Sequence, residues 1–339
     1  MKKESDAPSG EEWKALFGVA KVFKKMEPWV WMDDTDLFGV RNPEDGEIGY
    51  CCVMGAAGEV FGLSAYLGPE GLMTYRKMVS GEIGIGSEEI LHAQKTLTVT
   101  FEDRKELDKE DLQVISNLKL KFRGRNGWPQ FRSYLPGYVP WYLTAGQTRF
   151  LTTVLEQAVN VAGRLMDDPK LLRQKGEDLV LVRILEKRKK APGWRDSWIE
   201  PESWEKPKTP SGPIDEVRLH RIRNQLKKAQ SIWEIDTFYY PGAIAEQGRP
   251  YYPSLSLIVD RASDIVLGSW LSAPWEGFSG FQEQVMNHLQ NSSDLPRTIR
   301  VRKEEIFELL EPIAGPLKIG LKQVESLEGI RQVRAALVP

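Results

Sequence analysis

The chain has 339 residues, of which 46 are Lys or Arg and 48 are Asp or Glu, so its formal net charge is −2. Its hydrophobic fraction of 41% and charged fraction of 28% are typical of a soluble globular protein. The near-neutral balance excludes a strong overall field toward nucleic acid or membrane, but it is compatible with a local basic patch. Because this length exceeds what one hydrophobic core usually serves, we expect two domains.

The first residues, MKKESDAPSGEEWKALF, contain lysines near the start but no apolar run behind them. This pattern predicts neither a signal peptide nor a membrane anchor, and we expect residues 1–10 to form a disordered tail. No stretch approaches the roughly 18 consecutive apolar residues of a membrane span. The only cysteines, Cys51 and Cys52, are adjacent, which predicts neither a disulfide framework nor a zinc site and favours a reducing cytoplasm. On a strand they would alternate, one in the core and the other partly exposed.

Residues 11–205 predict an α+β domain, because helical and strand-like hydrophobic periods follow one another with turn signals between them. The expected elements are a helix over 11–27, strands over 37–40, 48–54 and 60–66, a short helix from Gly68, a strand over 96–101, a helix over 108–118, a helix over 144–166 and a strand over 179–185. Residues 128–142 are rich in proline and aromatic side chains and are expected to form a long loop. Repeated glycines over 81–86 lack the Lys-Ser/Thr of a phosphate-binding loop and predict a surface loop.

A proline-rich linker is predicted over residues 206–213. Proline stands at every third position there, at 207, 210 and 213, so the segment fits neither a helix interior nor a central strand. The linker separates the first domain from a second one over residues 214–339.

The second domain is predicted to be α/β. The expected elements are a basic helix over 214–230, strands over 232–239, 255–260 and 265–271, a helix over 278–289, a strand over 298–301, a helix over 303–310, a strand over 319–324 and a helix over 327–337. Three consecutive antiparallel strands followed by alternating helix–strand units predict a mixed sheet with helices packed against it.

Particular residues accompany this order. They are Trp233-Glu234-Ile235-Asp236-Thr237 on the first strand, Leu257-Ile258-Val259-Asp260 with the turn to Ser263 on the second, Ile265-Val266-Leu267-Gly268 on the third, and Pro296 through Val301 before a helix. With them, residues 214–339 resemble the ribonuclease-H-like superfamily and, within it, the integrase catalytic core. The resemblance implies that Asp236 takes the place of the first metal-binding carboxylate. Where the family presents its second aspartate, after the fourth strand, this chain has Arg302.

Two-metal phosphoryl chemistry needs several carboxylates around ions about 4 Å apart, and a guanidinium in one of those places repels the ions. We therefore expect a degenerate site without metal or cofactor, in which Asp236 has a structural role and bonds a local backbone group. The alternative is a divalent-metal-dependent nuclease or strand-transfer enzyme that uses Asp236 together with Glu325 or Glu328. Asp260 is interpreted as a turn former with Ser263.

The first half resembles an uncharacterised bacterial family of unknown function, whose members join such a region to a second domain like the one above. The residues that carry this resemblance are Leu37-Phe38-Gly39-Val40, residues 49–55 and 59–63, Asp103-Arg104, and the run from Trp128-Pro129 to Pro140-Trp141. It implies a two-domain architecture and no activity.

Two groups of aromatic and basic side chains are candidate binding surfaces. The group after the first strand of the second domain comprises Tyr239, Tyr240, Arg249, Tyr251 and Tyr252, together with Arg302; the group in the first domain comprises Trp128, Arg132, Tyr138 and Trp141. Bases stack on aromatic rings while arginines meet phosphates, so both groups suit single-stranded nucleic acid. In the structural interpretation, the aromatic side chains of the first domain fasten a loop to the core. The second-domain group is expected near the degenerate site and is the better candidate.

The leading hypothesis is a non-catalytic cytoplasmic protein that serves binding or scaffolding through a degenerate ribonuclease-H-like domain. Its partner is nucleic acid or another protein and not a membrane. A nucleic-acid-binding protein without catalysis is the further alternative to the nuclease.

Overall fold

The computed structural model describes residues 6–84, 88–173, 175, 178–186, 193–205, 213–246 and 248–337. The chain divides into two compact units, each a mixed α/β structure around its own sheet. Unit 1 comprises Met1–Pro136 and Pro140–Trp204, and unit 2 comprises Gly137–Val139 and Glu205–Pro339. Residues 206–212 of the predicted linker, residues 1–5 of the predicted tail and residues 85 and 86 of the predicted glycine-rich loop lie outside the described residues.

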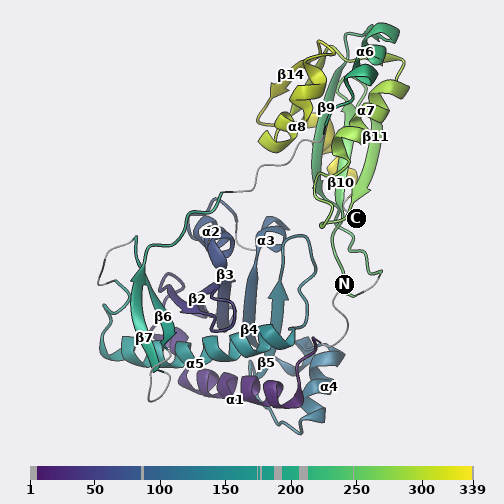
Figure 1. The fold of residues 1–339 in the computed structure, drawn as a ribbon. Coiled ribbons are helices and arrows are strands. Elements are labelled where there is room, and N and C mark those ends of the chain that lie inside the picture. Colours follow the sequence, from purple (N-terminus) through teal and green to yellow (C-terminus); the bar gives the residue numbers. More distant parts are fainter. Residues whose placement is uncertain are drawn as a thin grey trace. The chain divides into compact units, whose positions relative to one another are not determined.

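Unit 1 is built on a seven-stranded sheet with the order β5-β4-β3-β2-β1-β6-β7 (Figure 1). The strands are β1 Phe38–Arg41, β2 Ile48–Met54, β3 Gly62–Leu67, β4 Thr96–Glu102, β5 Trp128–Tyr134, β6 Val180–Glu186 and β7 Gly193–Ile199. The pairing of β1 with β6 is parallel, and the other pairings of this sheet are antiparallel.

Helices cover both faces of this sheet. Helices α1 (Gly10–Met26) and α5 (Ala145–Asp167) pack against each other on one face, and α2 (Gly68–Val79) lies on the other. The shorter elements are α3 (Glu88–Ala93), α4 (Lys109–Asn117) and the 3-10 turns Pro28–Val30 and Arg104–Glu106. Helix α1 buries residues at helical spacing, Leu16, Phe17, Ala20 and Phe23, and both long helices begin with a capping box.

Both cysteines are buried, which corrects the expectation that one is partly exposed. Cys51 and Cys52 do alternate on β2: Cys51 belongs to the core under α1 and α5, and Cys52 to the core under α2. Because helices cover both faces, both side chains are enclosed, at 0% and 4% exposure. Burial raises the pKa of both thiols, that of Cys52 to about 12.

The long loop predicted over 128–142 is wrong for its first half, since residues 128–134 form strand β5. Strand β7 was also missed, since no element is predicted between residue 185 and the linker. These are the two edge strands of the sheet. An edge strand tolerates proline, as Pro129 in β5, because one side of its backbone makes no ladder hydrogen bonds.

Unit 2 is built on a five-stranded sheet with the order β11-β10-β9-β13-β14. Its strands are β9 Ile232–Tyr239, β10 Ser254–Asp260, β11 Ile265–Ser272, β13 Thr298–Val301 and β14 Gly320–Gln323. The pairs β9–β10 and β10–β11 are antiparallel, and β9–β13 and β13–β14 are parallel. The predicted helix 214–230 is shorter, α6 (Glu216–Gln225), because Lys227–Lys228 (β8) pairs with Asp294–Leu295 (β12).

The side chains of β9 alternate between two cores. Trp233 and Ile235 face α6, α7 (Phe281–Asn291) and α8 (Glu304–Ala314), whereas Phe238 packs with Leu327 and Ile330 at α9 (Glu328–Leu337). Glu234 and Asp236 have the same parity as Phe238 and therefore point to the α9 face. Among the described residues, no helix is both long and apolar enough to span a membrane.

Candidate functional site

Asp236 is buried in the middle of the unit 2 sheet, with 3% exposure. Its Oδ1 accepts a hydrogen bond from the backbone N–H of Thr237 at 2.9 Å. This is the local backbone contact that its structural interpretation predicts. One such bond satisfies only part of a buried carboxylate, so the remaining charge needs a partner nearby.

Two cations provide that compensation. Arg302 Nε lies 4.0 Å from Asp236 Oδ2, and Lys303 Nζ lies 3.9 Å from Oδ1 while also donating to the carbonyl of Thr237. The parallel register explains the placement: Arg300 is paired with Glu234, so the residue two positions later comes alongside Asp236. The sequence had placed Arg302 opposite Asp236, but it did not identify Lys303.

A pocket of about 290 Å³ opens beside these groups and is called here the β9–α9 pocket. Three arginines line it: Arg302, which follows β13, and Arg331 and Arg334, which lie on α9. The rest of the lining is Asp236, Glu325, Ser326, Leu327 and Ile330. The pocket therefore combines three guanidinium groups with two carboxylates, one hydroxyl and an apolar wall.

Glu234 positions the helix that carries two of these arginines. It is 1% exposed, and its Oε2 accepts the backbone N–H groups of Gly329 at 2.7 Å and Ile330 at 3.2 Å. A carboxylate at a helix N-terminus satisfies orphan donors and matches the helix dipole. Sequence reasoning missed this role; the available signal was an acidic residue between Trp233 and Ile235 on a strand otherwise buried.

The acids that the nuclease alternative requires are only partly brought together. Glu325 lines the pocket with Asp236, whereas Glu328 pairs with Arg331 at 2.6 Å, a hydrogen bond that lowers the pKa of Glu328. Within the described residues, no group of three or more His, Cys, Asp or Glu is arranged to hold a metal ion. Two carboxylates among three guanidiniums do not fit a two-metal centre, whose ions need a surplus of anionic oxygen ligands.

The second-domain aromatic group lies elsewhere in unit 2. None of Tyr239, Tyr240, Arg249, Tyr251 and Tyr252 lines the β9–α9 pocket. Arg249 Nε donates to the carbonyl of Val139 at 2.8 Å, its guanidinium lies 5.5 Å from the ring centre of Tyr138, and burial lowers its pKa to about 10. Arg249 and Tyr251 line a separate pocket with Glu246 and Trp275. Binding by these residues stays a prediction.

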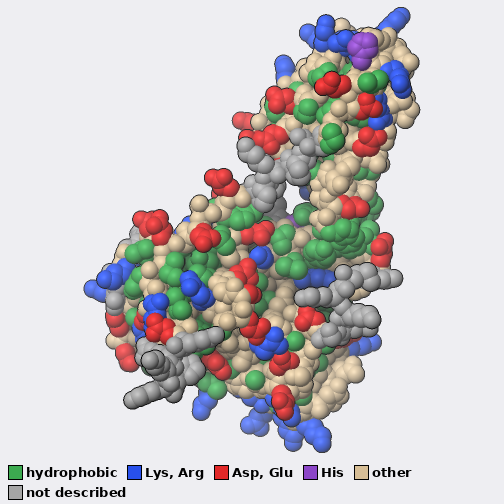
Figure 2. Space-filling view, in the orientation of Figure 1, with side chains coloured by type: hydrophobic (Ala, Val, Ile, Leu, Met, Phe, Trp, Pro, Cys, Tyr) green, Lys and Arg blue, Asp and Glu red, His purple; other side chains and the backbone are tan. Residues whose placement is uncertain are grey.

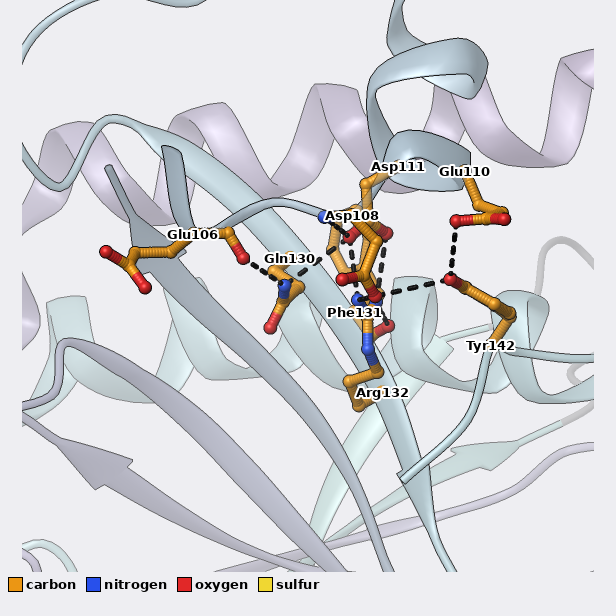
Figure 3. A network of polar contacts seen from close by, with 8 residues as sticks. All are labelled: Glu106, Asp108, Glu110, Asp111, Gln130, Phe131, Arg132 and Tyr142. Atoms are coloured by element: carbon orange, nitrogen blue, oxygen red, sulfur yellow. Dashed lines mark hydrogen bonds and ion pairs between the residues drawn. The ribbon is translucent and has the colours of Figure 1, made fainter. Parts of the chain in front are cut away.

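Arg132 of unit 1 is not an exposed phosphate contact. It is 8% exposed, and its guanidinium bonds Asp108 at 2.7 Å and Asp111 at 2.7 and 2.9 Å (Figure 3). The ring of Tyr142 lies 4.9 Å from it, and the Tyr142 hydroxyl reaches Asp108 and Glu110. This network joins β5 to α4, so its physical role is to hold the sheet edge to the helix.

Trp128 and Trp141 are attached to the same sheet edge. The Trp128 ring lies 5.8 Å from that of Phe122, and Trp141 exchanges backbone hydrogen bonds with Ser133 of β5 at 2.8 and 2.9 Å. The Trp128 ring packs against the core, as in the interpretation that aromatic side chains fasten the segment, whereas Trp141 is held through its backbone.

The basic side chains of α6 gather on one end of unit 2. Figure 2 shows Lys and Arg side chains with a histidine over this helix, where His220, Arg221 and Arg223 are exposed. Arg218 is instead bonded to Glu283, Asn287 and Gln290 of α7. The exposed face is therefore solvated, and Arg218 holds α6 against α7.

Asp260 forms the turn with Ser263 that the sequence predicts. Its carboxylate accepts hydrogen bonds from the backbone N–H and the hydroxyl of Ser263.

Comparison with known proteins gives two family matches. Residues 13–183, about half of the chain, match "Domain of unknown function (DUF7309)", and residues 218–338 match "Domain of unknown function (DUF6930)". No curated protein matches the sequence. A solved structure, "Crystal structure of the Mos1 Strand Transfer Complex", is 11% identical over 77% of this chain and 76% of that chain, with a TM-score of 0.17. The chain therefore belongs to the family described as "Domain of unknown function (DUF7309)".

Proposed function

We propose that this chain is a non-catalytic cytoplasmic binding protein whose second unit is a ribonuclease-H-like domain with an inactivated metal site. The observation that carries the proposal is the pair of cations, Arg302 and Lys303, about Asp236, at 4.0 and 3.9 Å. A buried carboxylate beside two cations is already charge-compensated, and a divalent ion entering there meets a guanidinium at close range. Binding, rather than phosphoryl transfer, is the chemistry that such a site supports.

The strand arrangement of unit 2 supports the inherited fold. Three antiparallel strands, β9 to β11, precede two strands that run parallel to β9, and helices α7 and α8 precede β13 and β14 respectively. This is the order that the ribonuclease-H and integrase-core resemblance implies. The first strand carries Asp236, and Arg302 follows the fourth.

Metal binding and cleavage test the proposal on the full-length chain. Titration with Mn²⁺, followed by electron paramagnetic resonance, is expected to give no specific binding. Incubation with single-stranded DNA, double-stranded DNA and an RNA–DNA hybrid in Mg²⁺ or Mn²⁺ is expected to leave each substrate intact. Arg302→Asp restores a second carboxylate beside Asp236 and is expected to gain measurable Mn²⁺ binding, so it serves as the positive comparison.

The nuclease or strand-transfer alternative has one specific observation in its favour, which is that Asp236 and Glu325 line the same pocket. It requires wild-type cleavage that depends on Mn²⁺ or Mg²⁺ and disappears in Asp236→Asn. That result would overturn the non-catalytic proposal.

A further inference from the structure

We infer that the β9–α9 pocket binds the phosphate group of a small hydroxylated phosphate monoester. The inference rests on the proposed function, because it assigns phosphate binding to the arginines and not to divalent ions held by Asp236. Its starting point is the convergence of Arg302, Arg331 and Arg334 on one pocket from two separate elements. Arg331 and Arg334 are three residues apart on α9 and so lie on one face of the helix.

Two of the three arginines, Arg302 and Arg334, have unused hydrogen-bonding capacity, whereas Arg331 donates to Glu328 at 2.6 Å. Within the described residues, the guanidinium groups of Arg302 and Arg334 make no hydrogen bond: Arg302 approaches Asp236 only to 4.0 Å, and Arg334 stacks over the Phe238 ring at 4.5 Å. The Arg302 side chain is 45% exposed and can be reached by a ligand. Each guanidinium offers several N–H donors in a planar fork that matches the oxygens of a phosphate.

Arg302 and Arg334 are held in place without a hydrogen-bonded carboxylate, whereas Arg331 is paired with Glu328. The stack on Phe238 orients Arg334, and Glu234 fixes the start of the helix that carries it. Asp236 offsets part of the positive charge, but Lys303 lies as close to it as Arg302 does. With Lys303 beside Asp236 and Glu328 beside Arg331 included, four cations lie against three carboxylates, so the site keeps a net positive charge that a phosphate anion can balance.

The rest of the lining indicates what the phosphate is attached to. Leu327 and Ile330 form an apolar wall, and Ser326 adds a hydroxyl. Asp236 and Glu325 are acceptors, which repel a second anion but accept hydrogen bonds from hydroxyl groups. A pocket of about 290 Å³ suits a small ligand rather than a polymer segment. Together these features favour a phosphate monoester of a small polyhydroxylated molecule, such as a sugar phosphate.

The test uses the full-length chain in EDTA, titrated by calorimetry with ribose 5-phosphate, inorganic phosphate and ribose as probes. Ribose 5-phosphate is expected to bind more tightly than inorganic phosphate, and ribose alone is expected not to bind. Arg302→Gln and Arg334→Gln each remove a charge-assisted contact and are expected to weaken binding about tenfold or more. Arg221→Gln, on the exposed face of α6, is the matched control and is expected to bind as the wild type does.

Asp236→Asn gives a result that a metal site would not give. Removing this carboxylate relieves repulsion and frees Arg302, so binding of ribose 5-phosphate is expected to tighten several-fold, whereas a metal-dependent site would lose its ligand. Circular dichroism and the thermal midpoint of each variant show whether its fold is retained, and variants that unfold are replaced by Arg331→Gln.

Three outcomes overturn the inference. If ribose 5-phosphate does not bind with or without Mg²⁺, the phosphate-site inference is refuted and the non-catalytic proposal stands. If binding requires Mg²⁺ and is lost in Asp236→Asn, both the inference and the non-catalytic proposal are refuted. Equal binding of a short oligonucleotide with and without a 5′-phosphate, in competition with ribose 5-phosphate, assigns the pocket to a nucleic-acid backbone instead.

Discussion

Arg132 illustrates at the scale of one residue how a buried cation stabilises unit 1. Its side chain is 9% exposed, and that of its partner Asp111 is 11% exposed. Arg132→Met keeps the volume but leaves Asp111 buried without its cation. We expect a loss of about 3–5 kcal/mol in the free energy of unfolding, the usual cost of removing one partner of a buried pair. Urea unfolding followed by tryptophan fluorescence measures it.

Arg149 is the matched control for this prediction. It pairs with Glu12 and Glu44 as Arg132 pairs with its aspartates, but its side chain is 46% exposed. Solvent and salt screen such a pair, so Arg149→Gln is expected to unfold at nearly the wild-type urea concentration. Equal losses in the two variants would contradict the role assigned to burial.

His288 makes the stability of unit 2 dependent on pH. Burial lowers its pKa, its Nε2 has no hydrogen-bond partner among the described residues, and its ring packs 5.3 Å from that of Trp233. The unfolded chain takes up a proton at about pH 6.5, whereas the folded one does so only at lower pH. The unfolded state therefore binds more protons in this window, and stability falls as pH decreases below about 6.5.

Thermal unfolding between pH 7.5 and 5 tests this sign. His288→Phe keeps an aromatic ring against Trp233 and removes the titration, so its stability is expected to fall less over that range. His220→Gln, on the exposed surface of α6, is expected to follow the wild-type profile. A steeper fall in His288→Phe than in wild type would refute the assignment.

The position of Arg302 near Asp236 was available from the sequence only through the ribonuclease-H-like resemblance, which puts Arg302 where the family has its second aspartate. The parallel register of β9 and β13 gives the physical reason for this proximity. Sequence reasoning gave no access to Arg331 and Arg334, whose approach to Asp236 depends on how α9 crosses the sheet. It also could not show that Arg132 is bonded to Asp108 and Asp111, since these acids lie more than twenty positions away.

At the scale of elements, hydrophobic periodicity predicted all five strands of the main unit 2 sheet and the central strands of the unit 1 sheet, but it missed both edge strands of unit 1. Strands β2, β9 and β13 begin and end as expected, because their neighbours on both sides demand a regular apolar pattern. Strands β5 and β7 are edges of the unit 1 sheet and contain Pro129 and polar side chains without that pattern. Pairing with one neighbour and packing of a few aromatic rings define them, and neither can be derived from local periodicity.

Helix α9 depends on Glu234, a residue of another element. Glu234→Ala removes both hydrogen bonds to Gly329 and Ile330 and is expected to cost about 2–4 kcal/mol, more than a solvent-exposed cap, because the acceptor is 1% exposed. Amide hydrogen exchange should show faster exchange over α9 and a smaller change over α7. Glu234→Gln retains an acceptor oxygen and is expected to lose less.

This helix also carries Arg331 and Arg334, so Glu234→Ala couples stability to binding. Ribose 5-phosphate is expected to bind more weakly to Glu234→Ala although Glu234 does not line the pocket. Unchanged protection of α9 in this variant would show that packing on Leu327 and Ile330, rather than the carboxylate, holds the helix.

At the scale of the whole molecule, the buried side chains form separate cores. The clusters under α1, α5 and α2 contain only residues of unit 1, and those around α7, α8 and α9 contain only residues of unit 2. Each core lies around its own sheet. Residues that share one hydrophobic core unfold cooperatively, so we expect one unfolding transition for each unit, two in total.

Calorimetry of the full-length chain tests this division with the variants already described. Arg132→Met is expected to lower the midpoint of one transition, and Glu234→Ala is expected to lower the midpoint of the other. Each variant should leave the second midpoint unchanged, because the two residues belong to different units.

Cysteine labelling identifies which transition belongs to unit 1. Cys51 and Cys52 are enclosed in unit 1, and burial holds their thiols protonated, so they should react with a thiol reagent only when unit 1 unfolds. Ribose 5-phosphate is expected to raise only the transition that Glu234→Ala lowers, since a ligand stabilises the unit that binds it. A single transition that both variants and ribose 5-phosphate shift together would mean that the units unfold as one.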